Sequence, residues 1–431
     1  MKKFSKYNFF IDNTVNVLLH NIANEQTLVM DTSIAKLIQK YIEKIDELEA
    51  IHPTLFNTLL EREIIIDKDT DEVANIITKW EKAESSNSNY SITIIPTMAC
   101  NLNCWYCYEE HKAGEVLQEP TLDKIKKYIL SVITNQDLQN FNIDFFGGEP
   151  LICYTNVVKP LMEFIKENCT QYGIKYSVHF TTNAVLLTPQ MVEELLNYTP
   201  NIAFQITLDG NKCMHNRVRS TKNGKPTYDI IVKNINLLLR KRIFVTVRVN
   251  FTKDNIDSIV DIIDTFRELD KEEKTYIIFD FQQVWQDKHN VEVVEKIEKI
   301  ALNFMEQGLN VMWNTLYSKY RCYAEYSNKV VINHNGDVFK CTARNFRSSQ
   351  REGILTDNGE ILWNSKFFKR MDLKNGLNVC KQCEIFPICF GGCSQLKLEA
   401  SSENTCLKGW TKKEKENFVE KRLKQKLIVR K

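Results

Sequence analysis

Residues 92–107 read Ile-Thr-Ile-Ile-Pro-Thr-Met-Ala-Cys-Asn-Leu-Asn-Cys-Trp-Tyr-Cys. The opening stretch Ile92–Ile95 predicts a strand, and three cysteines follow it at the spacing Cys-x3-Cys-x2-Cys, at Cys100, Cys104 and Cys107. Three thiolates in one tight loop can hold a cubane of four irons, for which a full complement would be four cysteines. The fourth iron would then be open to a ligand, as catalytic zinc keeps an open position. The alternative reading of such a loop is a structural zinc site.

Strand-like and helix-like stretches alternate regularly from residue 91 onward. Six such units in series predict an α/β fold with a parallel sheet, either open or closed into part of a barrel. In such sheets the active site lies at the carboxyl ends of the strands, where the cysteine loop also falls. The expected strands are 92–95, 143–146, 176–180, 202–208, 244–249 and 276–281, and the expected helices lie near 121–134, 157–168, 189–197, 228–240, 255–268 and 291–306.

Composition narrows the class of protein. The 431 residues carry 57 Lys+Arg against 55 Asp+Glu, a net charge of +2, which gives no support to nucleic-acid binding. No stretch is apolar enough to predict a membrane span, and Asn8, Asp12 and Asn13 interrupt any signal-peptide core. A cytoplasmic location is therefore expected, where disulfides are disfavoured. The 13 cysteines then need another use, and metal binding is the first candidate.

The cysteine loop resembles the signature of the radical S-adenosylmethionine superfamily. The resemblance implies that S-adenosylmethionine chelates the open iron of a [4Fe–4S] cluster held by Cys100, Cys104 and Cys107. An electron from the cluster would cleave the cofactor, and the resulting 5′-deoxyadenosyl radical would abstract a hydrogen atom from substrate. The family favours an aromatic residue before the third cysteine, and Tyr106 fits that preference.

Further segments match the same family at strand ends. Gly147-Gly148-Glu149-Pro150 follows the second expected strand and matches the segment that binds the methionine amino group. Glu149 could accept a hydrogen bond from that group. The resemblance also makes Asn183, Thr207 and Arg219 cofactor contacts, although taken singly Asn183 could be a turn residue and Arg219 an ordinary surface charge.

The C-terminal cysteines resemble the SPASM domain, an extension found in many radical S-adenosylmethionine enzymes that modify peptides. The resemblance implies two auxiliary clusters and hence three [4Fe–4S] clusters in all. The distal cluster would be bound by Cys380, Cys383, Cys389 and Cys406, and the proximal cluster by Cys322, Cys341 and Cys393. From Arg321 onward the sequence otherwise predicts a loop-rich part held by metal.

An alternative for these seven cysteines is a pair of zinc ribbons, for which they are one ligand short. Fully ligated family members have another cysteine shortly before the position of Cys322, where Leu316 and Tyr317 stand here. The proximal cluster could therefore have an open iron that takes a substrate thiolate, or a ligand from Asp, His, Tyr or water. Thr342 follows Cys341 where the sulfatase-maturing branch has an aspartate, which counts against formylglycine formation.

The first ninety residues predict a separate unit of short strands followed by two amphipathic helices. It resembles the winged-helix element with which peptide-maturing radical enzymes bind a leader peptide as an added strand. A plain structural cap is the alternative. The expected domains are 1–82 for leader recognition, 90–308 for a partial (β/α)6 barrel, 309–412 for the SPASM part and 413–431 for a basic helix.

These features predict an enzyme that modifies a ribosomally made precursor peptide carrying a leader. Oxidative thioether formation is favoured by the possible open iron, while carbon–carbon crosslinking and epimerisation stay open. The resemblance implies an electron donor of the ferredoxin or flavodoxin type, and no nucleic-acid or membrane partner is expected. Two alternatives are a related enzyme acting on a folded protein or small molecule, and a non-catalytic iron–sulfur regulator.

Overall fold

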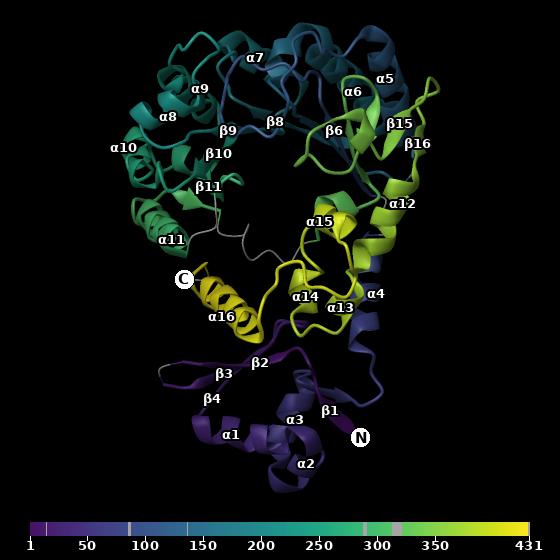
Figure 1. Ribbon diagram of the computed structural model, residues 1–431, viewed down its shortest axis with the longest axis vertical. Helices are drawn as coiled ribbons and strands as arrows, with labels where there is room; N and C mark the ends of the chain where they lie inside the picture. Colours follow the sequence, from purple (N-terminus) through teal and green to yellow (C-terminus); the bar gives the residue numbers. More distant parts are fainter. Residues whose placement is uncertain (14, 85–87, 136, 288–290, 313–320, 430–431) are drawn as a thin grey trace. The chain divides into compact units, whose positions relative to one another are not determined.

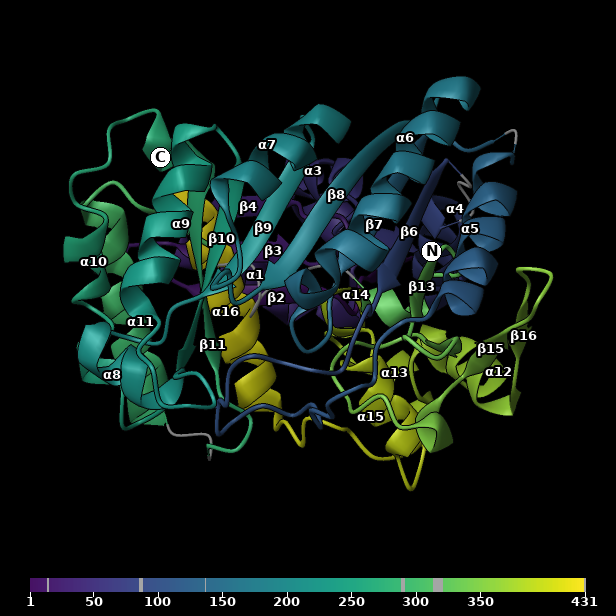
Figure 2. The same cartoon turned by 90° about the horizontal axis from the view of Figure 1, so that it is seen from above.

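The computed structural model describes residues 1–13, 15–84, 88–135, 137–287, 291–312 and 321–429 (Figures 1 and 2). The chain divides into two compact units. The sheet unit comprises Asn87–Met312 and Tyr326–Phe368, and the terminal unit comprises Met1–Ser86, Trp313–Glu325 and Lys369–Lys431.

A mixed sheet dominates the sheet unit. Among the described residues it has eleven strands in the order β12-β11-β10-β9-β8-β7-β6-β13-β14-β15-β16. Neighbours from β12 to β13 pair in parallel, so the carboxyl ends of β6 to β11 lie at one edge, as the sequence predicts. The parallel strands are β6 (Asn89–Ile94), β7 (Asn140–Phe145), β8 (Lys175–Thr182), β9 (Ile202–Thr207), β10 (Phe244–Phe251), β11 (Ile277–Gln283) and β12 (Asn310–Val311).

Helices connect these strands and cover one face of the sheet (Figure 2). They are α5 (Glu119–Ile133), α6 (Lys159–Tyr172), α7 (Pro189–Tyr198), α8 (Lys212–Val218), α9 (Tyr228–Arg240) and α11 (Val291–Glu306). The prediction of one helix over 255–268 is wrong. That stretch forms the short turns η4 (Ile256–Ser258) and α10 (Ile262–Thr265), where backbone bonds such as Ile259 to Ile256 and Ile262 to Ile259 span three residues instead of the four of an α-helix.

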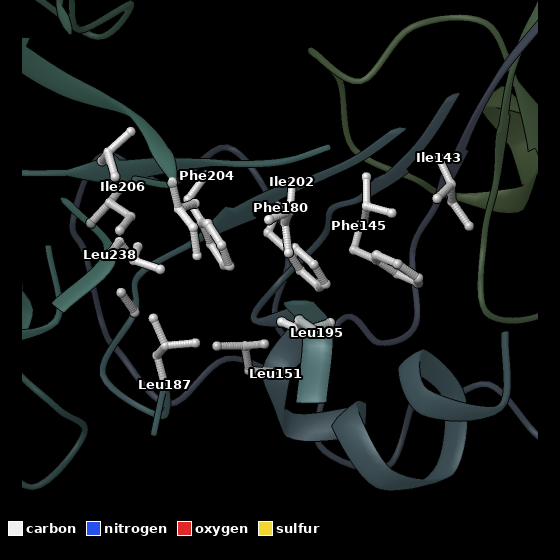
Figure 3. Close-up of a cluster of buried hydrophobic side chains, with 14 of the residues drawn as sticks. Ile143, Phe145, Leu151, Phe180, Leu187, Leu195, Ile202, Phe204, Ile206 and Leu238 are labelled. Atoms are coloured by element: carbon white, nitrogen blue, oxygen red, sulfur yellow. The ribbon is translucent and has the colours of Figure 1, made fainter. Parts of the chain in front are cut away.

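The hydrophobic core lies between the sheet and these helices. Along β9, buried Ile202, Phe204 and Ile206 alternate with less buried Ala203, Gln205 and Thr207. Figure 3 shows the apolar side chains of neighbouring strands on this face, and the rings of Phe145, Phe180 and Phe204 stack at centroid distances of 4.9 and 5.2 Å. The opposite face of the parallel strands is therefore left to more polar, half-buried residues.

The segment after Cys322 differs from the loop-rich expectation. β13 (Lys329–Ile332) pairs in parallel with β6 and begins an antiparallel meander with β14 (Asp337–Phe339), β15 (Gly353–Leu355) and β16 (Ile361–Trp363). Three-residue strands carry little periodicity. Asn335-Gly336, with Gly336 at φ +84°, is the hairpin signal that could have revealed the first turn.

In the terminal unit, the strands β2, β3 and β4 form a small antiparallel sheet, and β1 pairs with β5. Helices and further turns follow the strands and carry the C-terminal cysteines. The elements are β1 (Lys2–Phe4), β2 (Asn8–Asp12), β3 (Val17–Asn21), β4 (Thr27–Met30), α1 (Thr32–Tyr41), α2 (Glu47–Ile51), α3 (Pro53–Glu61), β5 (Ile65–Asp67), α4 (Glu72–Glu84), α13 (Asn378–Lys381), α14 (Phe386–Cys389), α15 (Ser394–Glu399) and α16 (Lys412–Val429), while α12 (Ser365–Asp372) runs from one unit into the other.

None of the helices in the described part of the chain combines the length and apolar character needed to cross a bilayer.

Replacing Phe180 by Ala should lower the free energy of unfolding of the sheet unit by about 3–5 kcal/mol, because the ring is fully buried between two others. Urea unfolding followed by tyrosine and tryptophan fluorescence would measure the change. Phe368→Ala is the control, since that side chain is 57% exposed, and a change of no more than about 0.5 kcal/mol is expected. Equal losses in the two variants would contradict the assignment of Phe180 to the core.

Candidate functional site

The cysteine loop leaves the carboxyl end of β6 and is closed at its base by its own backbone. Thr97 and Val116 form an isolated antiparallel bridge, and the Thr97 hydroxyl donates a hydrogen bond to the Glu115 carbonyl at 2.7 Å. Farther along, Leu102 bridges Thr221 in the segment after α8. The loop is therefore held at its base and at its middle before any ligand binds.

The three cysteines of this loop lie close together and are half-buried. The Cys107 amide donates to the Cys104 carbonyl at 3.1 Å, and the Cys107 sulfur lies 3.2 Å from Nε2 of His111. Burial raises the pKa of the Cys100 thiol to about 12 and that of Cys107 to about 11, and it also raises the pKa of Cys104. A bound cation would favour the thiolate forms, which suits a metal-ligand set.

The donor set therefore fits an iron–sulfur cluster in its chemistry: three clustered thiols that a cation would convert to thiolates. No three His, Cys, Asp or Glu side chains in the described ranges converge as ligands of a single ion would. The assignment of these cysteines as iron ligands is therefore still a prediction.

The Gly-Gly turn after β7 packs directly against the cysteine loop. The Gly148 amide donates to the Thr97 carbonyl at 3.1 Å, and the Glu149 amide to the Ala99 carbonyl at 2.9 Å. A Cβ atom on Gly148 would lie 2.2 Å from the Ala99 carbonyl oxygen, closer than any real contact. Gly147 has φ +106° and equally little space. In this structure the glycines let two backbones touch.

Glu149 is fully buried and joins the ends of two strands. Its carboxylate accepts hydrogen bonds from the Leu151 amide at 3.0 Å, the Thr182 hydroxyl at 2.7 Å and the Asn183 amide at 2.8 Å. Burial raises the pKa of Glu149, whereas these hydrogen bonds oppose the rise. A carboxylate has about four acceptor sites, so one more donor, such as the predicted ammonium group, could still be accommodated.

Asn183 carries the link onward to the cysteine loop. Its amide nitrogen donates to the Asn101 side chain at 2.7 Å and lies 3.8 Å from the Cys100 sulfur. Thr207, also predicted to bind the cofactor, ends β9 half-buried beside Arg248 of β10. Both residues lie at the carboxyl edge of the sheet, as the sequence predicts, while their contacts with a cofactor are untested.

Tyr106 and Arg219 meet in a buried polar cluster. The Tyr106 hydroxyl donates to the Asp209 carboxylate and accepts hydrogen bonds from Arg219 at 2.7 Å and from the Asn250 amide group at 3.1 Å. Asp209 follows β9 and Asn250 lies near the end of β10, so the hydroxyl fastens the cysteine loop to both strands. Nε of Arg219 has no hydrogen-bond partner among the described residues.

Sequence reasoning missed Asp209, Asn250 and Glu109. The first two follow or end parallel strands, and that position is the signal that could have found them. Glu109 stands two residues after Cys107, where burial raises its pKa to about 8 and one carboxylate oxygen lacks a partner within the described residues. Nothing in the sequence around Glu109 predicts that burial.

The predicted distal cysteines gather in the terminal unit. The Cys383 amide donates to the Cys380 carbonyl at 3.0 Å. Burial raises the pKa of Cys389, and repulsion from Cys383 and Cys406 raises it further, which places these sulfurs within electrostatic reach of one another. These thiols therefore belong to one segment and influence one another electrostatically, and their role as ligands stays a prediction.

The predicted proximal cysteines are divided between the two units. Cys322 and Cys393 belong to the terminal unit, whereas Cys341 belongs to the sheet unit, where it is buried and accepts a hydrogen bond from the Ala343 amide at 3.3 Å. Leu316 and Tyr317, the positions considered for a missing ligand, lie outside the described residues. The structure therefore does not test which residue would be the fourth ligand of this cluster.

Comparison with known proteins agrees with this arrangement. Residues 94–266 match the sequence model of the Radical SAM superfamily. The chain is 22% identical to the radical SAM cyclopropyl synthase TigE of Paramaledivibacter caminithermalis, over 87% of this chain and 80% of that protein. The match to the superfamily begins at the last residue of β6 and includes the whole cysteine loop.

Solved structures show the same fold. Streptococcus suis SuiB bound to its precursor peptide SuiA is 18% identical, with 94% of this chain and 98% of that chain covered at a TM-score of 0.54. The enzyme anSMEcpe, with bound S-adenosylmethionine and a peptide, is 19% identical, with 79% and 99% covered at a TM-score of 0.60.

The chain is a radical S-adenosylmethionine enzyme, and membership of that class brings a [4Fe–4S] cluster and S-adenosylmethionine with it. Within the class, it is related to the SPASM-domain peptide maturases.

Replacing Tyr106 by Phe should keep the ring but leave Asp209, Arg219 and Asn250 without their shared partner. A buried polar group that loses its partner costs about 1–3 kcal/mol, so urea unfolding should show a loss in that range. Anaerobic titration should also show weaker binding of S-adenosylmethionine. Trp105→Phe is the control, because Trp105 is the adjacent residue and its side chain is 60% exposed. It should change neither the stability nor the binding of S-adenosylmethionine. Unaltered stability and binding in Tyr106→Phe would refute the anchoring role.

Gly148→Ala should displace the cysteine loop, because the added methyl group would meet the Ala99 carbonyl. We expect reconstituted protein to lose most of its catalytic-loop iron, measured by iron analysis and electron paramagnetic resonance. Gly114→Ala in the same loop is the control. Its added methyl group would strain the backbone, since Gly114 has φ +85°, but it would meet no other atom, because the space around it is open. It should cost about 1–2 kcal/mol of stability and retain iron. Full iron occupancy in Gly148→Ala would contradict the close approach.

Proposed function

We propose that this enzyme modifies a ribosomally made precursor peptide by oxidative crosslinking. The observation that carries the proposal is the cysteine loop, which lies at the carboxyl edge of a parallel sheet and is fastened there through Glu149, Asn183 and Tyr106. The relatives support the substrate class: TigE is named a cyclopropyl synthase, and SuiB has been solved with a precursor peptide.

Cys100, Cys104 and Cys107 would hold the catalytic cluster. When the cluster and S-adenosylmethionine are bound, they supply the abstraction of a hydrogen atom from an unactivated substrate carbon. The chain's own residues hold and orient these groups. Arg219 suits the cofactor carboxylate, because its guanidinium is buried, charged and has an unpaired Nε among the described residues. Glu149 has acceptor capacity left for the ammonium group.

Two auxiliary clusters belong to the proposal. Cys380, Cys383, Cys389 and Cys406 supply four thiols for a distal cluster, and their proximity in the terminal unit supports that assignment. Cys322, Cys341 and Cys393 would bind the proximal cluster. Its missing fourth cysteine favours either an open iron that binds a substrate thiolate or a non-cysteine ligand, and the first option makes a thioether the preferred product.

The N-terminal part would bind the leader of the precursor. Its small sheet ends in β4, which pairs with β3 on one side, so an extended peptide could add as a further strand. This is the arrangement expected of a winged-helix-like recognition element. An electron donor of the ferredoxin or flavodoxin type would reduce the catalytic cluster.

Formylglycine formation is not the preferred reaction. The residue after Cys341 is Thr342, which has no carboxylate to act as a base, and its carbonyl accepts a hydrogen bond from Tyr108 at 2.9 Å. Carbon–carbon crosslinking and epimerisation remain competing outcomes of the same hydrogen abstraction.

Anaerobic reconstitution followed by reduction with dithionite and addition of S-adenosylmethionine tests the class of chemistry. Formation of 5′-deoxyadenosine is expected, together with roughly twelve irons per chain for three cubanes. The variant Cys104→Ala should abolish the product, whereas the exposed Cys213→Ala should retain it.

A peptide assay then tests the substrate. Candidate short peptides encoded beside the gene would be incubated with the enzyme and analysed by mass spectrometry. Loss of two hydrogens, with fragmentation blocked between the joined residues, is the expected signature of a crosslink. Zinc in place of iron, or no 5′-deoxyadenosine, would overturn the proposal and favour a regulator. Cofactor cleavage accompanied by modification of a folded protein alone would overturn the peptide substrate.

A further inference from the structure

One face of the N-terminal sheet packs against the segment that contains the distal cysteines. Phe9 and Ile11 of β2 share a buried hydrophobic cluster with Phe386 and Phe390, and Cys383 packs against it. The other members of this cluster are Tyr7, Ile22, Ile76, Ile385, Ile388, Val419 and Leu423. All of these residues belong to the terminal unit, so the sheet and the cysteine segment have a common core.

The opposite face of the same sheet belongs to a different cluster. Phe10 of β2 packs with Leu19, Ile38 and Leu48, and its ring stacks on Phe4 at 5.9 Å. Because side chains alternate along a strand, the adjacent residues Phe9 and Phe10 point to opposite faces of the sheet, and a substitution at each one disturbs a different cluster. Among the described residues, the Phe9 face shares its cluster with the cysteine segment, and the Phe10 face does not.

Helix α4 makes aromatic and charged contacts that connect the N-terminal part to the cysteine segment. The ring of Trp80 meets that of Phe390 edge to face at 4.7 Å, and the guanidinium of Arg321 lies over both rings at 5.7 and 5.4 Å. Arg321 also pairs with Glu84 at 3.5 Å, with side chains 1% and 7% exposed. Glu84 also pairs with Lys374 at 3.0 Å, so the end of α4 is tied to the segment that leads into Cys380.

The cysteine segment has little regular structure with which to hold its own position. Helices α13 and α14 have four residues each, too short to be stable alone in water. Where a metal site orders such a segment, the free energy of metal binding becomes free energy of folding. Phe386 and Phe390 stand in this segment beside Cys389, so a site that ordered the thiols would also order these two rings.

We propose that the iron–sulfur site at Cys380, Cys383 and Cys389 has a structural function: it holds the aromatic face on which the N-terminal peptide-binding sheet is built. The cluster stabilises the sheet, and by thermodynamic reciprocity the sheet stabilises the cluster. The inference rests on the proposed function for the presence of the distal cluster, but on none of its catalytic steps.

The test measures how fast the distal site loses iron. The full-length chain carrying Cys100→Ala, Cys104→Ala, Cys107→Ala and Cys341→Ala would be reconstituted anaerobically, so that neither the catalytic nor the proximal cluster contributes signal. Phe9→Ala or Phe10→Ala is then added, and iron release to a chelator is followed by visible absorbance. Phe9→Ala should accelerate release about 5- to 150-fold, the usual range of coupling between sites. Phe10→Ala, the same change one residue away, should leave the rate within twofold.

Equal rates in the two variants would overturn the inference, as would failure of the starting chain to bind auxiliary iron. Cleavage of S-adenosylmethionine by the unaltered enzyme distinguishes these results from failure of the proposed chemistry. Should Phe9→Ala not fold, as judged by circular dichroism, Phe9→Leu replaces it with the same expected direction.

Hydrogen exchange provides a reciprocal measurement. In Cys383→Ala, peptides covering β2 and β3 should exchange at least tenfold faster than in the parent chain, while those covering β7 and β8 should be unchanged. Cys104→Ala, which removes a thiol from the sheet unit, should leave β2 and β3 protected. Unaltered protection of β2 and β3 in Cys383→Ala would count decisively against the structural role.

Discussion

The contact between two backbones, at Gly148 and at Ala99, sets the geometry on which the rest of the site depends. Because no side chain fits between them, the turn after β7 and the loop after β6 form one surface. Glu149 then reaches β8 from that surface, and Asn183 reaches back to the loop. The Tyr106 hydroxyl completes the arrangement by fastening the loop to β9 and β10. A loop without regular structure thus acquires a fixed shape from four neighbouring strands.

Much of this architecture could be predicted from local sequence. Helix α9 occupies the expected residues 228–240, and Gly147 and Gly148 follow their strand as expected. The roles of Asp209 and Asn250 could not be predicted, because they depend on which strand ends meet a tyrosine more than a hundred residues away. The helix expected over 255–268 is replaced by short turns with three-residue backbone bonds, although its apolar residues are buried as a helix pattern predicts.

The cysteines show a second limit of sequence reasoning. Spacing identified sets of thiols, but it could not say with which part of the protein each set packs. Cys380, Cys383 and Cys389 share a core with the N-terminal sheet, while Cys341 lies in the sheet unit. Packing of this kind depends on apolar residues such as Phe9 and Phe390, which are almost four hundred residues apart and carry no motif.

The pairing of β13 with β6 gives the strand that bears the cysteine loop a neighbour on each side. In a half-open barrel β6 would otherwise be an edge, and an edge of unpaired backbone groups invites association with other chains. Here the edges of the sheet in the described residues fall to β12 and β16, strands of two and three residues. The meander after Cys322 therefore moves the unpaired edge of the sheet away from the strand that carries the cysteine loop.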